Sequence, residues 1–238
     1  MTVRHDLAFA PGATLTVHHV GTEREPVLVV DCATGQVDAL RAFAADRAAF
    51  VPAAEVGSGY PGLLGTAPVA YIDAMVHGIL PLIATHFTGC PVRPVRARGN
   101  FSLVTTTPER LTADQRVPHV DTADRLQFAS VHFLSPDNRD GTAFFRHRAT
   151  GFETVDAERL PVYQAARERD PAPPRRYCIG EDDGFEAIET IAALPDRLML
   201  YRAALLHSGW ITTLPHGAAD PRQGRLTGNL FLQCRMDA

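Results

Sequence analysis

Short runs of strand-forming residues fill the C-terminal part of the chain and constrain its fold more than any other feature. They alternate with turn-forming segments, a pattern that is typical of β-sandwiches and β-barrels. The expected strands are Asn100–Thr106, Leu126–Leu134, Thr142–His147, Phe185–Ile191, Arg197–Leu206 and Leu226–Gln233. No internal repeat is visible, so the runs predict one β architecture rather than a series of repeated units.

The N-terminal part of the chain has a different pattern. Val27–Cys32 is a short apolar run that predicts a buried strand, and Asp38–Phe50 has a helical composition. Between Val69 and Phe87 apolar residues recur at steps of three and four, which predicts a helix packed on the back of a sheet. The sequence VGSGYPGLLG at residues 56–65 predicts an ordered irregular loop near a site entrance.

At 238 residues, the chain is expected to form a single domain. Residues 1–95 would supply an N-terminal strand and packing helices, and residues 96–238 the β core. A polar, Pro-rich insertion at about 149–184 interrupts the β runs, with a short helix expected at about Ala157–Arg169. Long insertions in such folds often act as lids over a site, although surface decoration would leave the same sequence pattern.

Composition excludes several functions. The formal net charge is −4, so no overall basic field is available and no nucleic-acid partner is expected. All 23 basic residues are arginine, which rules out a Schiff-base lysine and the lysine of a phosphate-binding loop. The four cysteines are scattered without a CxxC pair, so neither a zinc ribbon nor a disulfide framework is expected.

The sequence gives no sign of export or of a membrane partner. The first residues contain no apolar stretch of signal-peptide length, and Asp73, His77 and Pro81 interrupt the longest apolar run, Ala67–Phe87. We therefore expect a cytoplasmic protein that does not associate with a membrane. The sequence leaves the oligomeric state open.

Two separate segments carry residues suited to a catalytic metal ion. In the tetrapeptide PHVD, His119 and Asp121 would point to the same side of an extended strand and present a nitrogen and an oxygen to one ion. The hydrophobic run LMLYRAALLHSGW delivers His207 at the end of an expected strand. Two histidines and one carboxylate leave positions open on Fe(II), unlike the closed shell of a structural zinc site.

The sequence GRLTGN begins the last expected strand and carries a candidate anion clamp. An inward-pointing Arg225 would bind a carboxylate through two parallel hydrogen bonds. Thr227, two residues further on, shares its face and would add a hydroxyl group. Asn229, Phe231 and Gln233 continue the same inward row.

The order of H-x-D, a distant histidine and R-x-T resembles the iron(II)- and 2-oxoglutarate-dependent dioxygenase superfamily. The segment LQFASVHFLSPDNRDGTAFFRHR resembles the strand, turn and G-T-x-F hairpin that follow the H-x-D in that family. FEAIETIAALPDRLMLYRAALLHSG resembles its Pro-Asp-Arg turn and the strand ending in the distal histidine. VLVVDCATGQVDALRAFA is similar to the leader of the prolyl-hydroxylase-like branch. The resemblance covers about residues 27–50 loosely and 96–234 well, and is nearest to small bacterial members of unassigned substrate.

This resemblance implies a mainly β fold with flanking helices, built on a double-stranded β-helix (jelly-roll) core. It implies that His119, Asp121 and His207 are the iron ligands, and that Arg225, supported by Thr227, holds the distal carboxylate of 2-oxoglutarate. Fe(II), 2-oxoglutarate and O2 would be the cofactors, with release of succinate and CO2. The expected reaction is hydroxylation of a small molecule such as an amino acid or natural-product intermediate.

The sequence departs from the family pattern in two places. The gap between His207 and Arg225 is longer than the common one, which makes Arg222 an alternative clamp. No counterpart is evident before His119 for the tyrosine that often binds the cosubstrate, and Ser102 or Thr106 would replace it.

The substrate contacts follow from strand alternation alone. Thr142, Phe144 and Arg146 share one face of a strand, so Arg146 would point inward and bind a substrate carboxylate. An outward ion pair of Arg146 is an equal alternative. Gln127 and Trp210 are further candidates for substrate binding.

Two rival functions fit the same ligands. A cupin-like metal enzyme would use them without 2-oxoglutarate, and a non-catalytic jelly-roll binding domain would keep the fold without the chemistry. A serine hydrolase is disfavoured because the sequence has no G-x-S-x-G elbow. His132 lies one residue off the inward register, so we expect it to be packed rather than catalytic.

Overall fold

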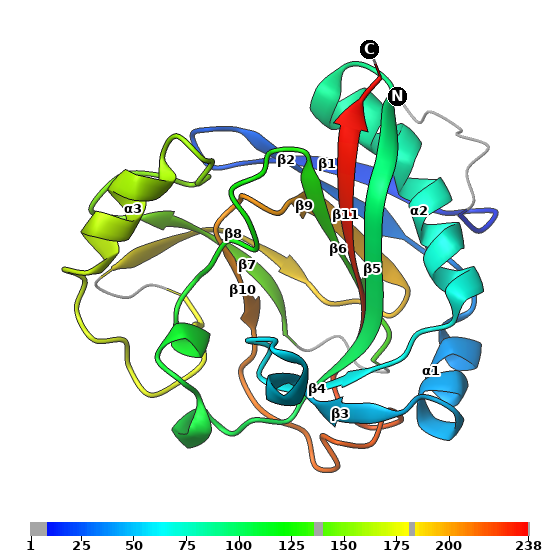
Figure 1. The fold of residues 1–238 in the computed structure, drawn as a ribbon. Coiled ribbons are helices and arrows are strands. Elements are labelled where there is room, and N and C mark those ends of the chain that lie inside the picture. The colour runs from blue at the N-terminus through cyan, green and yellow to red at the C-terminus, as the bar shows by residue number, and fades with distance from the viewer. Residues whose placement is uncertain (1–8, 136–139, 181–183, 238) are drawn as a thin grey trace.

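The computed structural model describes residues 9–135, 140–180 and 184–237, and its strands form two antiparallel sheets (Figure 1). The larger sheet has the order β1-β2-β9-β6-β11-β5-β4-β3, and the smaller has the order β10-β7-β8. The strands are β1 (Thr14–Val20), β2 (Glu25–Asp31), β3 (Phe50–Pro52), β4 (Gly62–Gly65), β5 (Val92–Val104), β6 (Gln127–Phe133), β7 (Gly141–His147), β8 (Phe185–Ala192), β9 (Arg197–Arg202), β10 (His207–Trp210) and β11 (Leu226–Met236).

The pairing of the core strands is that of a jelly roll. β5 pairs with β11, the short segment at His119 with the start of β10, β6 with β9, and β7 with β8. In chain order the first segment therefore pairs with the last, the second with the second last, and so on inward. This nested pairing is a long double strand wound into two facing sheets. The predicted fold class, a mainly β protein with a double-stranded β-helix core, is confirmed.

Side chains from the two sheets meet in the interior. Ala129 and Tyr201 of the larger sheet and Phe144 and Ile191 of the smaller sheet belong to one buried cluster. The Phe144 ring meets the Tyr201 ring edge-on, with 5.3 Å between their centroids. This cluster closes one end of the interior and leaves the other end free to form a cavity.

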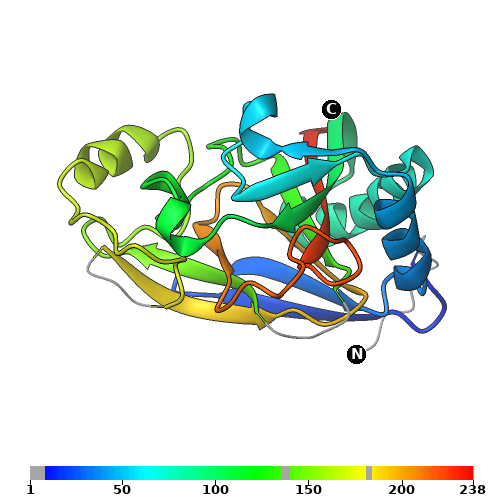
Figure 2. The same ribbon diagram turned by 90° about the horizontal axis from the view of Figure 1, so that it is seen from below.

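Helices α1 (Val37–Asp46) and α2 (Val69–Ile83) pack against the outer face of the larger sheet (Figures 1 and 2). Met75 and Ile79 of α2 share a buried cluster with Leu200 and Leu230 of that sheet, as the apolar periodicity predicts. With the π-helical turn that follows, the span Val69–Thr88 is long and apolar enough to cross a membrane by length and composition. The buried side of a core helix gives the same signal.

The insertion at residues 149–184 packs on the outer face of the smaller sheet. Its helix α3 runs over Leu160–Arg167, shorter than predicted, and Tyr163 of α3 is buried with Phe145 and Phe185 of that sheet. Residues 181–183 of the insertion, and residues 136–139 of the predicted turn after β6, lie outside the described residues. The role of a lid stays a prediction.

The structure corrects three secondary-structure expectations. The expected strand Arg197–Leu206 ends at Arg202, because the following residues bond to other segments: the Ala203 carbonyl accepts from Asp121 and the Leu206 amide donates to Glu153. The expected helix at Asp38–Phe50 ends at Asp46. The N-terminal part holds β1, β3 and β4 in addition to the one strand predicted there.

A buried hydrogen-bond network ties the turn before β9 to the turn after β2. Asp196 lies there with φ at 61°, and its carboxylate accepts hydrogen bonds from Thr34, Gly35 and His132. His132 is fully buried and lies 3.0 Å from the Tyr71 hydroxyl of α2, so it is packed, as expected. Burial alone would raise the pKa of Asp196, but the hydrogen bonds from His132, Thr34 and Gly35 outweigh it and lower the pKa to about 2.

Substitution of Asp196 by asparagine is expected to lower the free energy of unfolding by about 2 kcal/mol at pH 7. Asparagine tolerates the left-handed backbone and keeps the shape, so the change removes mainly the charge. Because the folded-state pKa is depressed, this stabilisation is present above about pH 4 and is lost as the pH falls through about 2. Urea unfolding at several pH values measures it. The fully exposed Asp38, as Asp38→Asn, serves as the control with a change under about 0.5 kcal/mol; an equal loss at pH 2 and pH 7 would contradict this account.

Candidate metal centre and cavity

The structure brings together the three residues that the sequence singled out as metal ligands. His119 and His207 are paired at the edge of the smaller sheet, each amide donating to the other's carbonyl at 2.9 Å. Asp121 follows two residues later, where its amide donates to the carbonyl of Ala203 at 2.8 Å. Backbone hydrogen bonds therefore fix all three residues on neighbouring segments.

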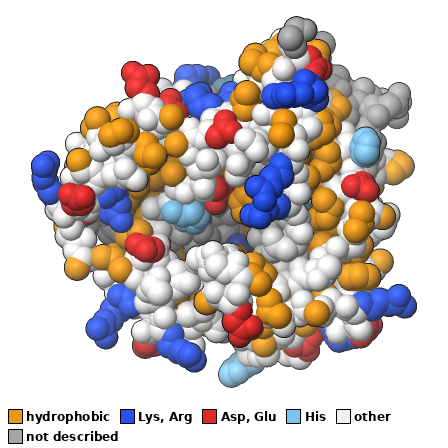
Figure 3. Space-filling view, viewed as in Figure 1, with side chains coloured by type: hydrophobic (Ala, Val, Ile, Leu, Met, Phe, Trp, Pro, Cys, Tyr) orange, Lys and Arg blue, Asp and Glu red, His pale blue; other side chains and the backbone are white. Residues whose placement is uncertain are grey.

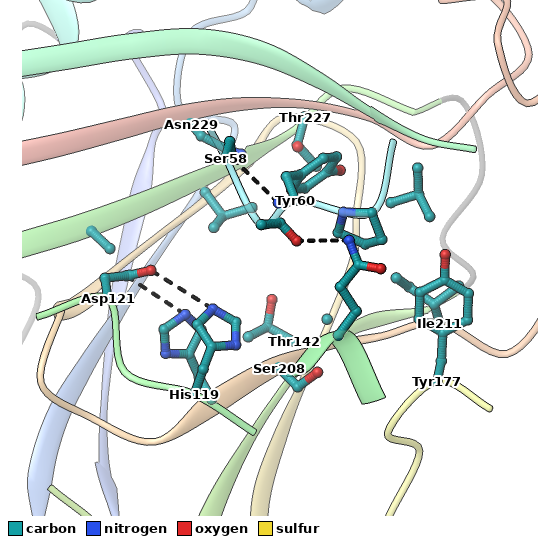
Figure 4. A pocket seen from close by; sticks show the side chains of 18 of the residues that line it. Ser58, Tyr60, His119, Asp121, Thr142, Tyr177, Ser208, Ile211, Thr227 and Asn229 are labelled. Carbon is teal, nitrogen blue, oxygen red and sulfur yellow. Dashed lines mark hydrogen bonds and ion pairs between the residues drawn. The ribbon is translucent and has the colours of Figure 1, made fainter. Parts of the chain in front are cut away.

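The side chains of the three residues converge, and Figure 4 shows those of His119 and Asp121 pointing toward each other. The Asp121 carboxylate lies 3.7 Å from Nε2 of His119 and 3.7 Å from Nε2 of His207. The two imidazole rings are 4.5 Å apart between centroids, and one potential ligand atom from each residue lies within 4.8 Å of the other two. One metal ion suits this set of two nitrogens and one oxygen.

Neighbouring groups orient these side chains. Nδ1 of His207 lies 2.8 Å from the carbonyl of Leu205, which leaves Nε2 directed at Asp121, and the Tyr201 ring packs edge-on against the imidazole. A backbone partner of this kind sets the tautomer and angle of a ligand histidine. Oδ2 of Asp121 is buried and has no hydrogen-bond partner among the described residues. A buried carboxylate oxygen that has no other partner and lies between two imidazoles fits the role of a metal ligand.

The electrostatics of the cluster keep both imidazoles neutral at physiological pH. The His119 side chain is 53% exposed, but it opens into a cavity, so burial and the charge of His207 still lower its pKa to about 4. Burial lowers the pKa of His207 to about 4 and raises that of Asp121 to about 6. Neutral imidazoles keep a lone pair free for a metal ion.

The cluster lies on the wall of a cavity of about 530 Å³, which opens as a hollow in the middle of one face of the molecule (Figure 3). This volume is in the range that holds small-molecule ligands. Its walls come from both sheets, from the loop at residues 58–61 and from the insertion, through Tyr177. The Tyr177 hydroxyl donates to the carbonyl of Thr106 at 2.5 Å and ties the insertion to the segment after β5.

A second polar group lines the same cavity at the start of β11. Arg225 donates to the carbonyl of Gly141 at 2.8 Å and lies over the Phe133 ring, while its Nε is buried and unpaired among the described residues. No carboxylate of the described residues forms an ion pair with it, although most buried charges are paired. Thr227 is 1% exposed and follows on the same wall. An anionic ligand would complete this group.

Tyr60 also belongs to this polar group, and the sequence did not predict it. Its hydroxyl is buried and has no hydrogen-bond partner of good geometry among the described residues. Burial raises the pKa of Tyr60, while the charge of Arg225 and the nearby hydroxyls of Thr227 and Ser102 lower it, so the four side chains lie together. The loop VGSGYPGLLG, expected near a site entrance, supplies this tyrosine, and its one tyrosine was the available signal.

The structure corrects the alternatives that the sequence left for these roles. Arg222 is exposed and pairs with Asp46 of α1, so it does not replace Arg225 at the cavity. Thr106 contributes its carbonyl to Tyr177 and is not part of the cavity lining. Ser102 lies behind the lining, where its hydroxyl accepts hydrogen bonds from the amides of Asn100 and Asn229.

The three residues expected to bind substrate do not line the cavity formed by the described residues. Arg146 shares a strand face with Phe144, but the Phe144 ring fills the interior before Arg146 is reached, and a bulge follows it. The Arg146 guanidinium instead binds Glu153 and Glu186, the first at 2.6 Å.

Trp210 and Gln127 also lie outside the cavity lining. Trp210 ends β10 and packs in the cluster beneath the insertion. Gln127 begins β6, one row beyond the part of the sheet that lines the cavity.

The fold and the site define a jelly-roll protein whose cavity holds a two-histidine, one-carboxylate cluster. The chain belongs to a family whose model matches residues 11–232 and is described as a family of unknown function (DUF6445). A search of curated proteins found no match.

Several solved structures are similar to this chain at low identity. HygX from Streptomyces hygroscopicus, with nickel, 2-oxoglutarate and hygromycin B bound, has 11% identity over 87% of this chain and 82% of its own, with a TM-score of 0.46. An N-substituted L-amino acid dioxygenase from Burkholderia ambifaria in complex with alpha-KG has 13% identity over 95% and 98%, with a TM-score of 0.43. SnoK, an alpha ketoglutarate dependent carbocyclase from nogalamycin biosynthesis, has 12% identity over 89% and 82%, with a TM-score of 0.42. The fold assignment rests on the strand pairing of this chain.

Proposed function

We propose that the protein is an Fe(II)- and 2-oxoglutarate-dependent oxygenase. The observation that carries the proposal is a single cavity with two groups of polar side chains that include buried atoms without hydrogen-bond partners. The first is the cluster of His119, Asp121 and His207, and the second is Arg225 with the Tyr60 hydroxyl. The similar structures named above also include proteins with this cosubstrate, but the proposal depends on the residues of this chain.

The donor set suits iron. Two neutral imidazoles and one carboxylate form the three-ligand set of non-haem Fe(II) oxygenases, which leaves positions for a chelating cosubstrate and O2. The orphaned Oδ2 of Asp121 lies among these donors and has no other partner in the described residues. The structural zinc sites of proteins use four protein ligands, and the described residues bring only these three together.

The second end of the cavity suits the distal carboxylate of 2-oxoglutarate. Arg225 offers a guanidinium nitrogen without a partner among the described residues, and Tyr60 and Thr227 offer hydroxyl groups beside it. A guanidinium binds a carboxylate through charge-assisted hydrogen bonds, which are the strong ones in proteins. These residues would hold the cosubstrate in place while His119, Asp121 and His207 hold the metal.

The chemistry that Fe(II) and 2-oxoglutarate supply when bound is oxidation of a substrate C–H bond by O2, with one oxygen atom entering the substrate, the other entering succinate, and release of CO2. This chain's residues bind and orient the reactants and exclude water. Val131 and Phe231 provide apolar surface near the cluster, and Thr142 and Ser208 provide hydroxyl groups. A partly apolar cavity of this kind limits the access of water to a reactive centre.

The proposal extends to the type of reaction, the branch of the superfamily and the cellular location. Hydroxylation of a small molecule is the expected outcome, and the N-terminal sequence favours the prolyl-hydroxylase-like branch of the superfamily. We also propose that the chain acts as a single domain in the cytoplasm, without membrane or nucleic-acid partners. Tyr177, which lies on the cavity wall, supports a lid role for the insertion at residues 149–184.

The proposal is tested by following oxygen from labelled O2. Fe(II)-loaded protein incubated with 2-oxoglutarate and ¹⁸O2 is expected to form succinate that carries one ¹⁸O atom, even without substrate, at a slow uncoupled rate. The Zn(II)-loaded protein is the control, because zinc has no redox chemistry. Mass spectrometry of the succinate measures the label.

Unlabelled succinate, or none above the zinc control, would contradict the proposal. Iron binding without succinate would favour a cupin-like metal enzyme that does not use 2-oxoglutarate. Failure to bind iron would favour a non-catalytic binding domain.

A further inference from the structure

We propose that Arg96 and Arg98 form an anion-binding rim at the mouth of the cavity, and that the substrate carries a carboxylate or phosphate group which this rim holds. The inference rests on the proposed function, because it names the substrate class of the same site. It replaces Arg146, which is tied to Glu153 and Glu186, as the cationic group that recognises substrate.

The strand register places both arginines on the cavity face of the larger sheet. Arg98 pairs with Phe231 of β11, which pairs with Ala129 of β6, which pairs with Tyr201 of β9. Phe231, Ala129 and Tyr201 all line the cavity. Side chains opposite one another across a sheet lie on the same face, so Arg98 extends this row at its β5 end.

The row deeper in the cavity confirms which face of β5 is involved. Asn100, two residues from Arg98, pairs with Asn229, and both asparagines line the cavity. Phe101 and Leu103 alternate with Asn100 and are buried against α2 on the opposite face. By the same alternation Arg96, which pairs with Gln233, lies one row outside Arg98.

The two arginines are available for a ligand. Both are exposed, and neither guanidinium group forms a hydrogen bond or ion pair within the part of the chain that the structure describes. By contrast, Arg197 binds Asp31 and Arg202 binds Glu25. Figure 3 shows basic side chains beside the hollow, over the region of β5 and β11.

The remaining charges leave the rim as the place for a second anion. Arg225 is the one arginine of the described cavity lining, and the proposed function assigns it to the cosubstrate. The lining between the rim and the metal cluster is neutral or apolar, with Asn229, Val131 and Phe231 along it. A substrate held at its anionic end by Arg98 and Arg96 would place an uncharged portion near His119.

The test compares small probes that differ in charge. Phenylacetate, phenyl phosphate and phenylacetamide are titrated into the full chain in ligand-observed saturation-transfer NMR. The titrations use Zn(II)-loaded protein with one equivalent of 2-oxoglutarate at Arg225, so that no excess of this dicarboxylate competes at the rim, and are repeated with the metal-free protein without it. We expect one or both anions to bind about fivefold more tightly than the amide. The preferred anion distinguishes a carboxylate from a phosphate substrate.

The double variant Arg96→Gln/Arg98→Gln is expected to lose this preference, and Arg96→Lys/Arg98→Lys to retain most of it. The control Arg47→Gln removes one positive charge from an exposed arginine at the end of α1 and is expected to retain the preference. No preference in the natural chain, or an unchanged preference in the glutamine double variant, would overturn the proposal. Because the rim needs no metal, its preference is expected in the metal-free protein too, so failure to form succinate would contradict the proposed function alone.

Discussion

Substitution of Asp121 by alanine is expected to weaken Fe(II) binding by more than about 100-fold and to stop succinate formation. Asp121 is the one carboxylate between the two imidazoles, and its Oδ2 has no other partner in the described residues. Loss of a residue that merely orients a metal ligand costs about 10–100-fold in metal affinity, so loss of a ligand is expected to exceed that range. Competition with a metal chelator of known affinity measures the effect.

A matched carboxylate separates ligand loss from a general change of charge. Asp114 also lines the cavity but lies outside the cluster, so Asp114→Ala is expected to keep the Fe(II) affinity of the natural chain. Equal loss of affinity in both variants would show that the effect is one of overall charge. Unchanged affinity in Asp121→Ala would exclude Asp121 as a ligand.

Replacement of Arg225 by glutamine is expected to weaken 2-oxoglutarate binding by about 10–150-fold, while Fe(II) affinity stays the same. The range follows from about 1.5–3 kcal/mol for a hydrogen bond to a charged group. Glutamine keeps a polar side chain, although a shorter one, and removes the charge that faces Tyr60. Titration of 2-oxoglutarate into the anaerobic Fe(II)-loaded protein measures the dissociation constant.

The neighbouring arginine offers the control for this prediction. Arg222 lies three residues earlier, pairs with Asp46 and is outside the cavity lining, so Arg222→Gln is expected to bind 2-oxoglutarate normally. A loss of affinity in Arg222→Gln together with normal binding in Arg225→Gln would reverse the assignment.

The sequence predicted the fold and the metal cluster because both have local signatures. Alternating strands and short turns define a β architecture without knowledge of distant contacts. His119 and Asp121 are two residues apart on an extended segment, and His207 follows an apolar run, so each piece was visible alone. Only the resemblance to a family joined them into one site before the structure was known.

Tyr60 could not be predicted because its role depends on a contact across the fold. It lies in a glycine-rich loop far along the chain from Arg225, and the pairing of β4 with β5 brings that loop over the cavity. A loop residue carries no periodicity that would mark its direction. The same limit applies to Tyr177, which reaches the cavity from the insertion.

Two predictions were wrong because a local sequence pattern does not report contacts with the rest of the fold. Strand alternation gave the face of Arg146 correctly, but it does not say where along a strand the cavity ends, and Phe144 ends it first. The run Arg197–Leu206 looked like one strand because Ala203, Ala204, Leu205 and Leu206 are all fully buried. Burial between segments gives the same apolar pattern as burial within a sheet.

In the proposed function, His119, Asp121 and His207 hold an iron ion, and 2-oxoglutarate binds this ion in the same cavity. Anaerobic titration of the Fe(II)-loaded protein with 2-oxoglutarate, followed by visible absorption, tests it most directly. We predict a weak charge-transfer band that saturates at one 2-oxoglutarate per iron, is absent in His119→Ala and requires more 2-oxoglutarate in Arg225→Gln. Iron bound by the natural chain with no band at saturating 2-oxoglutarate would contradict the account.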